Sequence, residues 1–393
     1  MSTVKQAQIA VVAVAALLVC GGAQAASSQV PAFQFDKTWP KPLPNNMKIG
    51  QVGGLSVDSH DHIWVVQRPS SLKPSEVEAT AGGAYGGMAG PNSGCCRPAP
   101  EVIEYDQEGN MVQAWGPQNK QDWPTQAPKS KDSFYGTLNA GERGLFIDTR
   151  DNVWIGSDGP GDTFALKLSK FGKPYLTLGK KGAENGGSND TTALNGASGL
   201  VVDASNNEVY IADGARNRRV IVLNGYTGKY IRHWGAYGKK PDDSVVMKPD
   251  SPDVDAPQFG DVSAIALSTD KLVYVGDRAN NRVQVFKTDG TFVKQGVIAP
   301  KTLAGTVFGI ALSPDPEQKF VYIADGSNEK VWILDRASMS VIGSFGSGGH
   351  NAGQFTTLYA IATDSKGNIY TGETWEGKRV QRFLYKGSEA AKK

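Results

Sequence analysis

Six short apolar runs along the chain are each preceded by a residue that bears on what chemistry the protein can do. The runs have the form GLSVD, GLFID or GIALS, and the residues before them are Gly53, Arg143, Ser198, Ser263, Phe308 and Tyr359. A guanidinium group binds carboxylates and oxyanions, and a phenol can pass a proton as a general acid or base. If these residues converge, they predict a site for a small anionic or hydroxylated molecule.

Each run is followed by a second run, and the recurrence of both indicates a β-propeller. The second runs include VWIGSD from Val153, VYIADG from Val209 and VYVGDR from Val273. Four short strands within about forty residues have the length and content of a propeller blade, and no helical periodicity competes with this pattern. Six such units predict an all-β, six-bladed propeller of NHL-type repeats. Residues 32–35 should supply the fourth strand of the last blade and close the ring.

The expected boundaries follow from the repeat and from the first residues. We expect a signal peptide at residues 1–25, because an apolar run leads to an A-x-A cleavage signal. A single propeller should fill residues 26–387, with a lid-like insertion at 68–100 in blade one, and 388–393 should form a C-terminal tail. Export implies a secreted or periplasmic protein that no membrane segment retains after cleavage.

The composition limits the classes of molecule that the protein is expected to bind. The formal net charge is +2 and the basic residues are scattered, which gives no surface for nucleic acid. Cys95 and Cys96 lie in the glycine-rich insertion. In an oxidising compartment they can form a vicinal disulfide, and two free thiols are the alternative. We therefore expect a small-molecule substrate or ligand, while the sequence leaves the oligomeric state open.

The second strand of four blades ends in an acidic residue to which we assign a structural role. These residues are Asp213, Asp277, Asp325 and Glu373. Buried carboxylates need partners. We expect them to accept hydrogen bonds from turn amides and from the basic residue that opens the next strand, such as Arg219, Arg282 or Lys330.

The repeats resemble those of the peptidyl-hydroxyglycine α-amidating lyase family and its secreted bacterial relatives. The resemblance covers most of the mature chain. It is carried by GQVGGLSVD (50–58), IWVVQRP (63–69), VYIADGARNRRVIVL (209–223), VYVGDRANNRVQVFKTDGTFVK (273–294) and GNIYTGE (367–373). It implies a six-bladed propeller that splits a carbinolamide C–N bond. The family uses a zinc ion held by three histidines, a tyrosine base and two substrate-binding arginines.

Carried onto this chain, the resemblance keeps the arginines but not the metal ligands. Arg68 and Arg278 stand at the arginine positions, and Ala215 stands at the tyrosine position. The three histidine positions hold Arg143, Ser263 and Tyr359. A guanidinium does not ligate zinc and hydroxyl groups are weak ligands, so we expect no metal and no other cofactor. We expect the four histidines at the surface: His60, His62, His233 and His350.

We therefore expect a metal-independent enzyme, lyase-like (C–N or C–O cleavage) or hydrolase-like, rather than a zinc-dependent amidating lyase. The expected catalytic residues are Arg68, Arg143, Arg278 and Tyr359. The expected substrate-binding residues are Ser198, Ser263, Phe308 and Asp158. In one alternative the arginines pair with Asp158, Asp261, Asp277 or Asp325 and only hold the blades together. In another, the propeller descends from an amidating-lyase-like ancestor and binds a ligand or a protein without catalysis.

Overall fold

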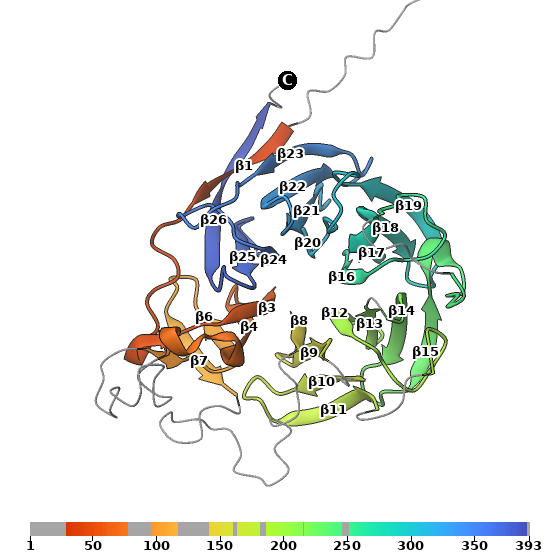
Figure 1. Cartoon of the computed structure of the whole chain (residues 1–393), viewed down its shortest axis with the longest axis horizontal. Coiled ribbons are helices and arrows are strands. Elements are labelled where there is room, and N and C mark those ends of the chain that lie inside the picture. Colours follow the sequence, from red (N-terminus) through yellow and green to blue (C-terminus); the bar gives the residue numbers. More distant parts are fainter. Residues whose placement is uncertain are drawn as a thin grey trace, which may run out of the picture.

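Six four-stranded antiparallel sheets stand around a central axis (Figure 1). The computed structural model describes residues 29–77, 96–116, 141–159, 163–180, 186–214, 216–245 and 251–390. The predicted all-β, six-bladed propeller is therefore confirmed. Among the described residues no helix has the length and apolar character that a membrane crossing requires. The expected signal peptide, Cys95 and Ala215 lie outside the described residues.

In every blade the strand nearest the axis is followed outward by three more (Figure 1). The innermost strands are β3 (Gln51–Val57), β8 (Glu142–Ile147), β12 (Ala197–Asp203), β16 (Val262–Leu267), β20 (Gly309–Leu312) and β24 (Leu358–Thr363). The second strands are β4 (Ile63–Arg68), β9 (Val153–Ser157), β13 (Glu208–Asp213), β17 (Leu272–Asp277), β21 (Phe320–Asp325) and β25 (Ile369–Glu373).

The third strands are β6 (Val102–Tyr105), β10 (Phe164–Leu168), β14 (Arg219–Asn224), β18 (Arg282–Lys287), β22 (Lys330–Asp335) and β26 (Val380–Ala390). The outermost strands are β7 (Met111–Trp115), β11 (Pro174–Gly179), β15 (Tyr230–Trp234), β19 (Phe292–Val297), β23 (Val341–Phe345) and β1 (Gln29–Phe35). Short 3₁₀ turns occupy η1 (Pro44–Asn46), η2 (Pro69–Ser71), η3 (Pro74–Glu76), η5 (Ala236–Gly238) and η6 (Arg278–Asn280).

The N-terminal strand closes the ring as expected. β1 pairs antiparallel with β26, with Phe33 opposite Tyr385 and Phe35 opposite Phe383. The pairing also extends from Gln29 opposite Ala390. The last strand therefore continues past the expected end of the propeller at residue 387, because the start of β1 offers its backbone groups to residues 388–390. Those three residues belong to blade six rather than to a C-terminal tail.

The core lies between neighbouring blades, because one twisted sheet cannot cover both of its own faces. Between blades three and four, for example, Trp234 lies 6.4 Å from Tyr210 and 5.9 Å from Phe286, measured between ring centroids. All three side chains are buried. This packing fixes the inner strands and therefore the side chains that their ends present to the axis.

The acidic residues at the ends of the second strands have the structural role expected of them. Asp213 accepts a hydrogen bond from Arg219 Nε and Asp277 accepts one from Arg282 Nε, both at 2.9 Å, and all four side chains are fully buried. Glu373 accepts from Arg379 Nε at 2.6 Å.

Asp325 differs from the expectation in its partner. Its Oδ2 accepts a hydrogen bond from Trp332 Nε1 at 2.7 Å, and the ammonium group of Lys330 lies over the Trp332 ring instead. The indole N–H on the same strand therefore takes the place of the expected cation.

Both ends of the 68–100 insertion are attached to the propeller. After β4, Lys73 pairs with Glu376 at 2.9 Å and Glu76 pairs with Lys378 at 2.6 Å, which ties this end to blade six. At the other end, β5 (Arg97–Pro98) pairs in parallel with β2 (Met47–Lys48). Cys96 is disulfide-bonded. The middle of the insertion, including Cys95, lies outside the described residues.

Candidate functional site

In four blades, the residue expected to enter the funnel is the extra residue of a β-bulge. Val52 pairs with Gln67 and Gly54 pairs with Val66, which leaves Gly53 between the two pairs. The same register shift occurs in three further blades, at Ser198, Ser263 and Tyr359. A bulge breaks the alternation of side chains and re-aims the extra residue. In these four blades the bulge thus explains why the residue before the run faces the axis.

In blade two the register shift falls one residue later, after Arg143. Arg143 keeps a partner, Gly156, and the following Gly144 is the extra residue. Gly144 has a φ of +58°, and a Cβ atom there would lie 2.6 Å from the Cα of Gly199. Only glycine fits this position, because other residues are disfavoured at positive φ and the added atom would collide with the next blade.

A cavity of about 80 Å³ lies on the axis where the inner strands begin. Five of the six predicted funnel residues line it: Gly53, Ser198, Ser263, Phe308 and Tyr359. Glycine and small aliphatic residues from the same strands make up the rest of its wall. The predicted convergence is therefore present for these five residues, whereas Arg68, Arg143 and Arg278 are not among the residues that line the cavity.

Arg143 links Tyr359, which lines the cavity, to the carboxylate of Asp158. Its Nε donates a hydrogen bond to the phenol oxygen of Tyr359, and its Nη1 forms an ion pair with Asp158. The guanidinium carbon also lies 5.0 Å from the centre of the Tyr359 ring. Phe308 packs edge-to-face on Tyr359, with ring centroids 6.1 Å apart. The phenol is thus held between a cation and an aromatic ring.

Arg278 lies on the other side of Phe308. Its guanidinium carbon is 4.9 Å from the Phe308 ring centre, and its Nη2 pairs with Asp261 at 2.6 Å. From the sequence, only a scaffold role is expected for Asp261. The structure places it beside the funnel, two residues before Ser263.

Arg68 differs from the other two arginines because its partners among the described residues are neutral groups rather than carboxylates. Its Nη2 donates to the backbone carbonyl of Glu142 at 3.0 Å, and its Nη1 reaches the side-chain oxygen of Gln51 at 3.4 Å. Its Nε is buried without a hydrogen-bond partner among the described residues. A buried donor that lacks an acceptor is unfavourable, so the hydrogen-bonding capacity of this arginine is only partly used.

The three guanidinium groups share one electrostatic environment. Burial lowers the pKa of Arg143. The carboxylates of Asp158 and Asp261 oppose this effect, and the charges of Arg278 and Arg68 add to it. Three cations thus lie near two carboxylates. The excess positive charge in a confined space favours an anionic ligand.

The scaffold alternative holds only in part. Asp158 and Asp261 do pair with funnel arginines, but Asp277 and Asp325 have Arg282 and Trp332 as partners. Arg68 has no ion pair among the described residues.

The two serines that line the cavity differ in the hydrogen bonds that their hydroxyl groups form. Ser263 Oγ donates toward the backbone carbonyls of Val307 and Gly276 and is buried. Ser198 Oγ donates to the carbonyl of Gly196 at 3.2 Å and lies 3.5 Å from Arg143 Nη1. Both line the cavity, and Ser198 is the one that contacts the cationic cluster.

The residues at the three family histidine positions do not fit a zinc ion. They offer a guanidinium group, a hydroxyl group and a phenol, of which the hydroxyl proton of Ser263 is already donated to backbone carbonyls. The phenol oxygen of Tyr359 accepts a hydrogen bond from Arg143. A divalent cation would also meet the positive charge of Arg143. This donor set is unlike the imidazole, thiolate and carboxylate ligands that zinc takes in proteins.

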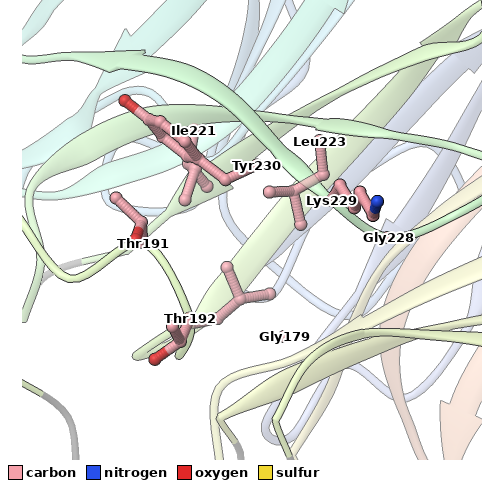
Figure 2. A pocket seen from close by; sticks show the side chains of 9 residues that line it. Gly179, Thr191, Thr192, Ile221, Leu223, Gly228, Lys229 and Tyr230 are labelled. Atoms are coloured by element: carbon pink, nitrogen blue, oxygen red, sulfur yellow. The ribbon is translucent and has the colours of Figure 1, made fainter.

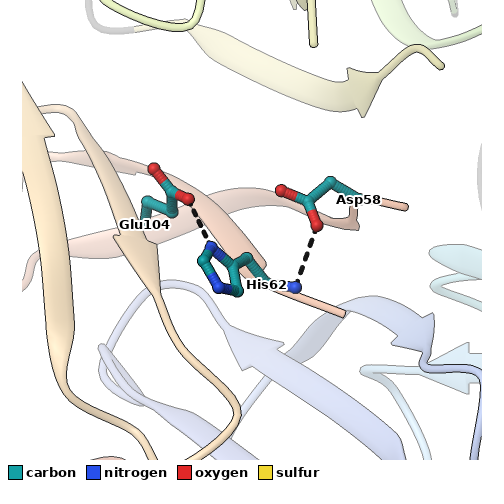
Figure 3. Close-up of side chains that lie close together, drawn as sticks. All are labelled: Asp58, His62 and Glu104. Atoms are coloured by element: carbon teal, nitrogen blue, oxygen red, sulfur yellow. Dashed lines mark hydrogen bonds and ion pairs between the residues drawn. The ribbon is translucent and has the colours of Figure 1, made fainter. Parts of the chain in front are cut away.

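Asp58, His62 and Glu104 form a second group of titratable residues (Figure 3). Asp58 and His62 lie in the turn between β3 and β4, and Glu104 lies on the neighbouring strand β6. Ligand atoms of the three lie within 4.8 Å of one another. Asp58 Oδ1, however, accepts the backbone amides of His60 and His62, and its Oδ2 accepts from Trp64 Nε1. The same pattern of bonds surrounds Asp148 in blade two. We therefore assign Asp58 to the turn rather than to a metal.

His62 is more than the solvated surface residue that the sequence suggested. It is half-buried, and its Nδ1 lies 2.6 Å from Glu104 Oε1 (Figure 3). Burial lowers its pKa, but the hydrogen bond and charge of Glu104, with Asp58 and Asp106, outweigh burial and leave the pKa raised. His233 is also half-buried, whereas His60 and His350 are exposed as expected.

A larger cavity, of about 210 Å³, lies away from the axis between blades two and three (Figure 2). Thr191, Thr192, Lys229 and Tyr230 surround an apolar floor that includes Ile221. Among the described residues of its lining, Lys229 is the one that carries a formal charge. We place the functional site in the funnel, because several charged and proton-carrying groups converge there.

The chain has measurable but distant relatives. No family model matches it. It is 24% identical to peptidyl-glycine alpha-amidating monooxygenase A of Xenopus laevis over 350 residues, which are 87% of this chain and 32% of that protein. It is 25% identical to peptidyl-glycine alpha-amidating monooxygenase of Mus musculus over 242 residues, 58% of this chain and 22% of that protein. The chain thus spans about a third or less of the length of these curated relatives.

Among solved structures, a catalytically inactive virginiamycin B lyase from Staphylococcus aureus, bound to quinupristin, matches with a TM-score of 0.45 and 11% identity. The match covers 91% of this chain and 88% of that one. The resemblance stated from the repeats is confirmed: the chain is an amidating-lyase-like six-bladed propeller.

Proposed function

We propose that the chain is a lyase-like or hydrolase-like enzyme that acts, without a metal ion, on a small anionic or hydroxylated substrate in the funnel. One observation carries this proposal. Beside the axial cavity, the charges of Arg68 and Arg278 act on Arg143, the carboxylates of Asp158 and Asp261 oppose them, and Arg143 donates to the phenol of Tyr359. The enzyme names of the curated relatives support a catalytic role.

The arginines would bind the anionic group of the substrate. Arg68 offers a buried N–H without an acceptor among the described residues, and Arg278 lies across the site on the face of Phe308. Hydrogen bonds between guanidinium and carboxylate groups are about twice as strong as those between neutral groups. The substrate would therefore be oriented by its charge.

Tyr359 is the group best placed to move a proton. In a lyase step on a hydroxylated carbon, its phenol oxygen, as phenolate, would take the hydroxyl proton while the C=O bond forms. The neighbouring C–N or C–O bond would break, and the leaving atom would keep the electron pair and accept the proton that Tyr359 had taken. Arg143 would compensate the negative charge on the phenol oxygen, because its Nε already donates there.

The size of the cavity limits what it can hold. Pockets that enclose a whole small ligand occupy about 300–1,000 Å³, whereas this cavity has about 80 Å³. A functional group fits on the axis, and the rest of the substrate would extend toward the rim.

A ligand-binding propeller without turnover is the second candidate. It is favoured by the ion pairs of Arg143 with Asp158 and of Arg278 with Asp261, which fix two of the three cations without a substrate. Such a protein would retain a small anion through purification and release it unchanged.

Calorimetry and product analysis test the proposal together. We expect acetate to bind the wild-type chain, and the double variant Arg68→Ala, Arg278→Ala to lose that binding. We expect product NMR on carbinolamide and ester carboxylates to show turnover of at least one class, and metal analysis to find far less than one zinc ion per chain. Equal acetate binding by both proteins would refute the anion site, and stoichiometric zinc would refute the metal-independent reaction.

Export stays part of this proposal. Residues 1–25 have the pattern of a cleaved signal, and export would place Cys95 and Cys96 in an oxidising compartment. N-terminal sequencing of protein collected outside the cytoplasm should begin at Ala26. An unprocessed N-terminus would contradict this part.

A further inference from the structure

Large apolar side chains are exposed on the described surface in two kinds of place. Eleven such residues are exposed. Nine lie on third or outermost strands or in the turns that join them: Val112, Phe171, Tyr175, Tyr226, Tyr230, Ile231, Val293, Val341 and Tyr385. The other two, Trp375 and Leu303, lie in loops on the funnel face, and they are the most exposed of all, at 67% and 62%.

Trp375 lies two residues after the end of β25. When the second-strand repeats that begin at Ile63, Val153, Val273, Val321 and Ile369 are aligned, the residues that match Trp375 are Pro69, Gly159, Ala279 and Ser327. Among the described blades, blade six is therefore the one with a large side chain at this position. Trp375 also has a φ of +50°. A bulky residue rarely adopts this conformation, and such strain is concentrated at functional sites.

Trp375 is connected to the Arg68 side of the site. The hydroxyl group of Thr374, the residue before it, donates to Gln51 Oε1 at 3.3 Å. The same oxygen accepts from Arg68 Nη1 at 3.4 Å. Glu376, the residue after it, pairs with Lys73. The loop that carries the tryptophan is therefore held against blade one, next to an arginine of the cluster.

Leu303 lies on the Arg278 side, in the connection between β19 of blade four and β20 of blade five. Gly305, two residues later, packs so closely on Arg278 that a Cβ atom would lie 2.5 Å from its carbonyl oxygen. Thr302, the residue before Leu303, accepts a hydrogen bond from Asn328 at 3.0 Å. This loop is likewise fixed beside a cation of the cluster.

We propose that Trp375 and Leu303 hold the apolar part of a ligand whose anionic end binds the arginines. The ligand class is an amphiphilic carboxylate, with an aromatic or large aliphatic group separated from its charge by a short chain. The inference rests on the proposed anion site and adds the source of its specificity. An indole offers a broad apolar face, and ordering its two side-chain torsions costs little conformational entropy.

Acetate and 4-phenylbutyrate are the probes that test this inference, since they share the charge and differ in the apolar part. We expect the wild-type chain to bind 4-phenylbutyrate at least tenfold more tightly than acetate in calorimetric titrations. Trp375→Ala should weaken 4-phenylbutyrate binding about tenfold and leave acetate binding unchanged, and Trp375→Phe should restore most of the loss. Phe171→Ala is the matched control, because Phe171 is a 47% exposed aromatic residue in the β10–β11 turn.

The outcomes separate this inference from the function on which it rests. The proposed apolar contact by Trp375 and Leu303 is refuted, and the anion site stands, in either of two cases. In the first, acetate binds but the phenyl group adds no affinity. In the second, the contribution of the phenyl group survives in Trp375→Ala. If Trp375→Ala weakens both probes equally, the residue supports the loop and does not select the ligand. If neither probe binds the wild-type chain, the proposed anion site is refuted, and the proposed role of Trp375 and Leu303 is refuted with it.

Discussion

Replacement of Arg68 by alanine should remove carboxylate binding and leave the fold almost as stable as before. In the folded chain this guanidinium makes one hydrogen bond of ordinary length, at 3.0 Å to the carbonyl of Glu142, and a longer contact of 3.4 Å to Gln51. Its Nε is buried without an acceptor among the described residues. It also adds to the positive charge that acts on Arg143. The side chain thus contributes both favourable and unfavourable terms to the free energy of unfolding.

These terms nearly cancel. Loss of the hydrogen bond from a charged donor costs about 1.5–3 kcal/mol, and removal of a buried donor that lacks an acceptor returns about 1–3 kcal/mol. The net change should be within about 1 kcal/mol, which corresponds to a shift of at most about 2–4 °C in Tm for a large domain. The bound carboxylate, in contrast, loses a charged hydrogen bond of about 1.5–3 kcal/mol. Its Kd should rise about 10- to 150-fold.

Arg282→Ala is the matched control for a scaffold arginine. Arg282 is fully buried, pairs with Asp277 at 2.9 Å and donates to the carbonyls of Ala256 and Gln258. Its removal leaves a buried carboxylate without its cation, which costs about 3–5 kcal/mol, and should lower Tm by about 10 °C.

Acetate titration calorimetry and thermal unfolding of both variants make the comparison. If Arg68→Ala melts as early as Arg282→Ala and still binds acetate with the wild-type Kd, then Arg68 belongs to the scaffold and the reasoning is wrong.

Three further substitutions test separate parts of the account. Tyr359→Phe keeps the aromatic packing but loses the proton carrier, so acetate should bind with a Kd within about threefold of wild type while turnover falls about 10²- to 10⁴-fold; unchanged turnover in a kinetic assay would exclude the phenol. Because the pKa of His62 is raised by Glu104, the pair stabilises the fold fully below pH ~6.5 and loses this effect as pH rises through the folded-state pKa. Urea unfolding of wild type and His62→Asn should therefore differ more at pH ~5.5 than at pH ~8.5; a difference independent of pH would contradict the pairing. Gly144→Ala must bring a Cβ to 2.6 Å from Gly199 Cα at positive φ. It should cost at least about 1–3 kcal/mol in denaturant unfolding, and a neutral result would show that the bulge can relax.

The blades were predictable from the sequence because each blade repeats the same local pattern of strand and turn residues. VYIADG and its variants place a β-branched and aromatic run before a turn, and six copies leave few alternatives. Closure by β1 followed from the missing fourth strand of the last blade, and the pairing of Phe33 with Tyr385 confirms it. The buried pairs Asp213–Arg219 and Asp277–Arg282 were predictable because their partners lie close in sequence.

The remaining features depend on contacts between segments that are distant in sequence. The Arg143–Tyr359 bond joins residues 216 positions apart, and Lys73 meets Glu376 across 303 positions. The bulge at Gly144, which keeps Arg143 in the ladder, could not be inferred from a run that otherwise matches its repeats. His62 was misjudged because its partner Glu104 lies on the third strand, outside the local pattern.

A crystal of this protein soaked in bromide, with the ion located by its anomalous signal, tests the central claim most directly. A halide probes the same positive potential as a carboxylate. The account predicts one strong peak on the axis, within hydrogen-bond distance of guanidinium nitrogens of Arg68 and Arg278 and beside Arg143. A funnel without bromide, or a metal ion coordinated there by Ser263 and Tyr359, would contradict it.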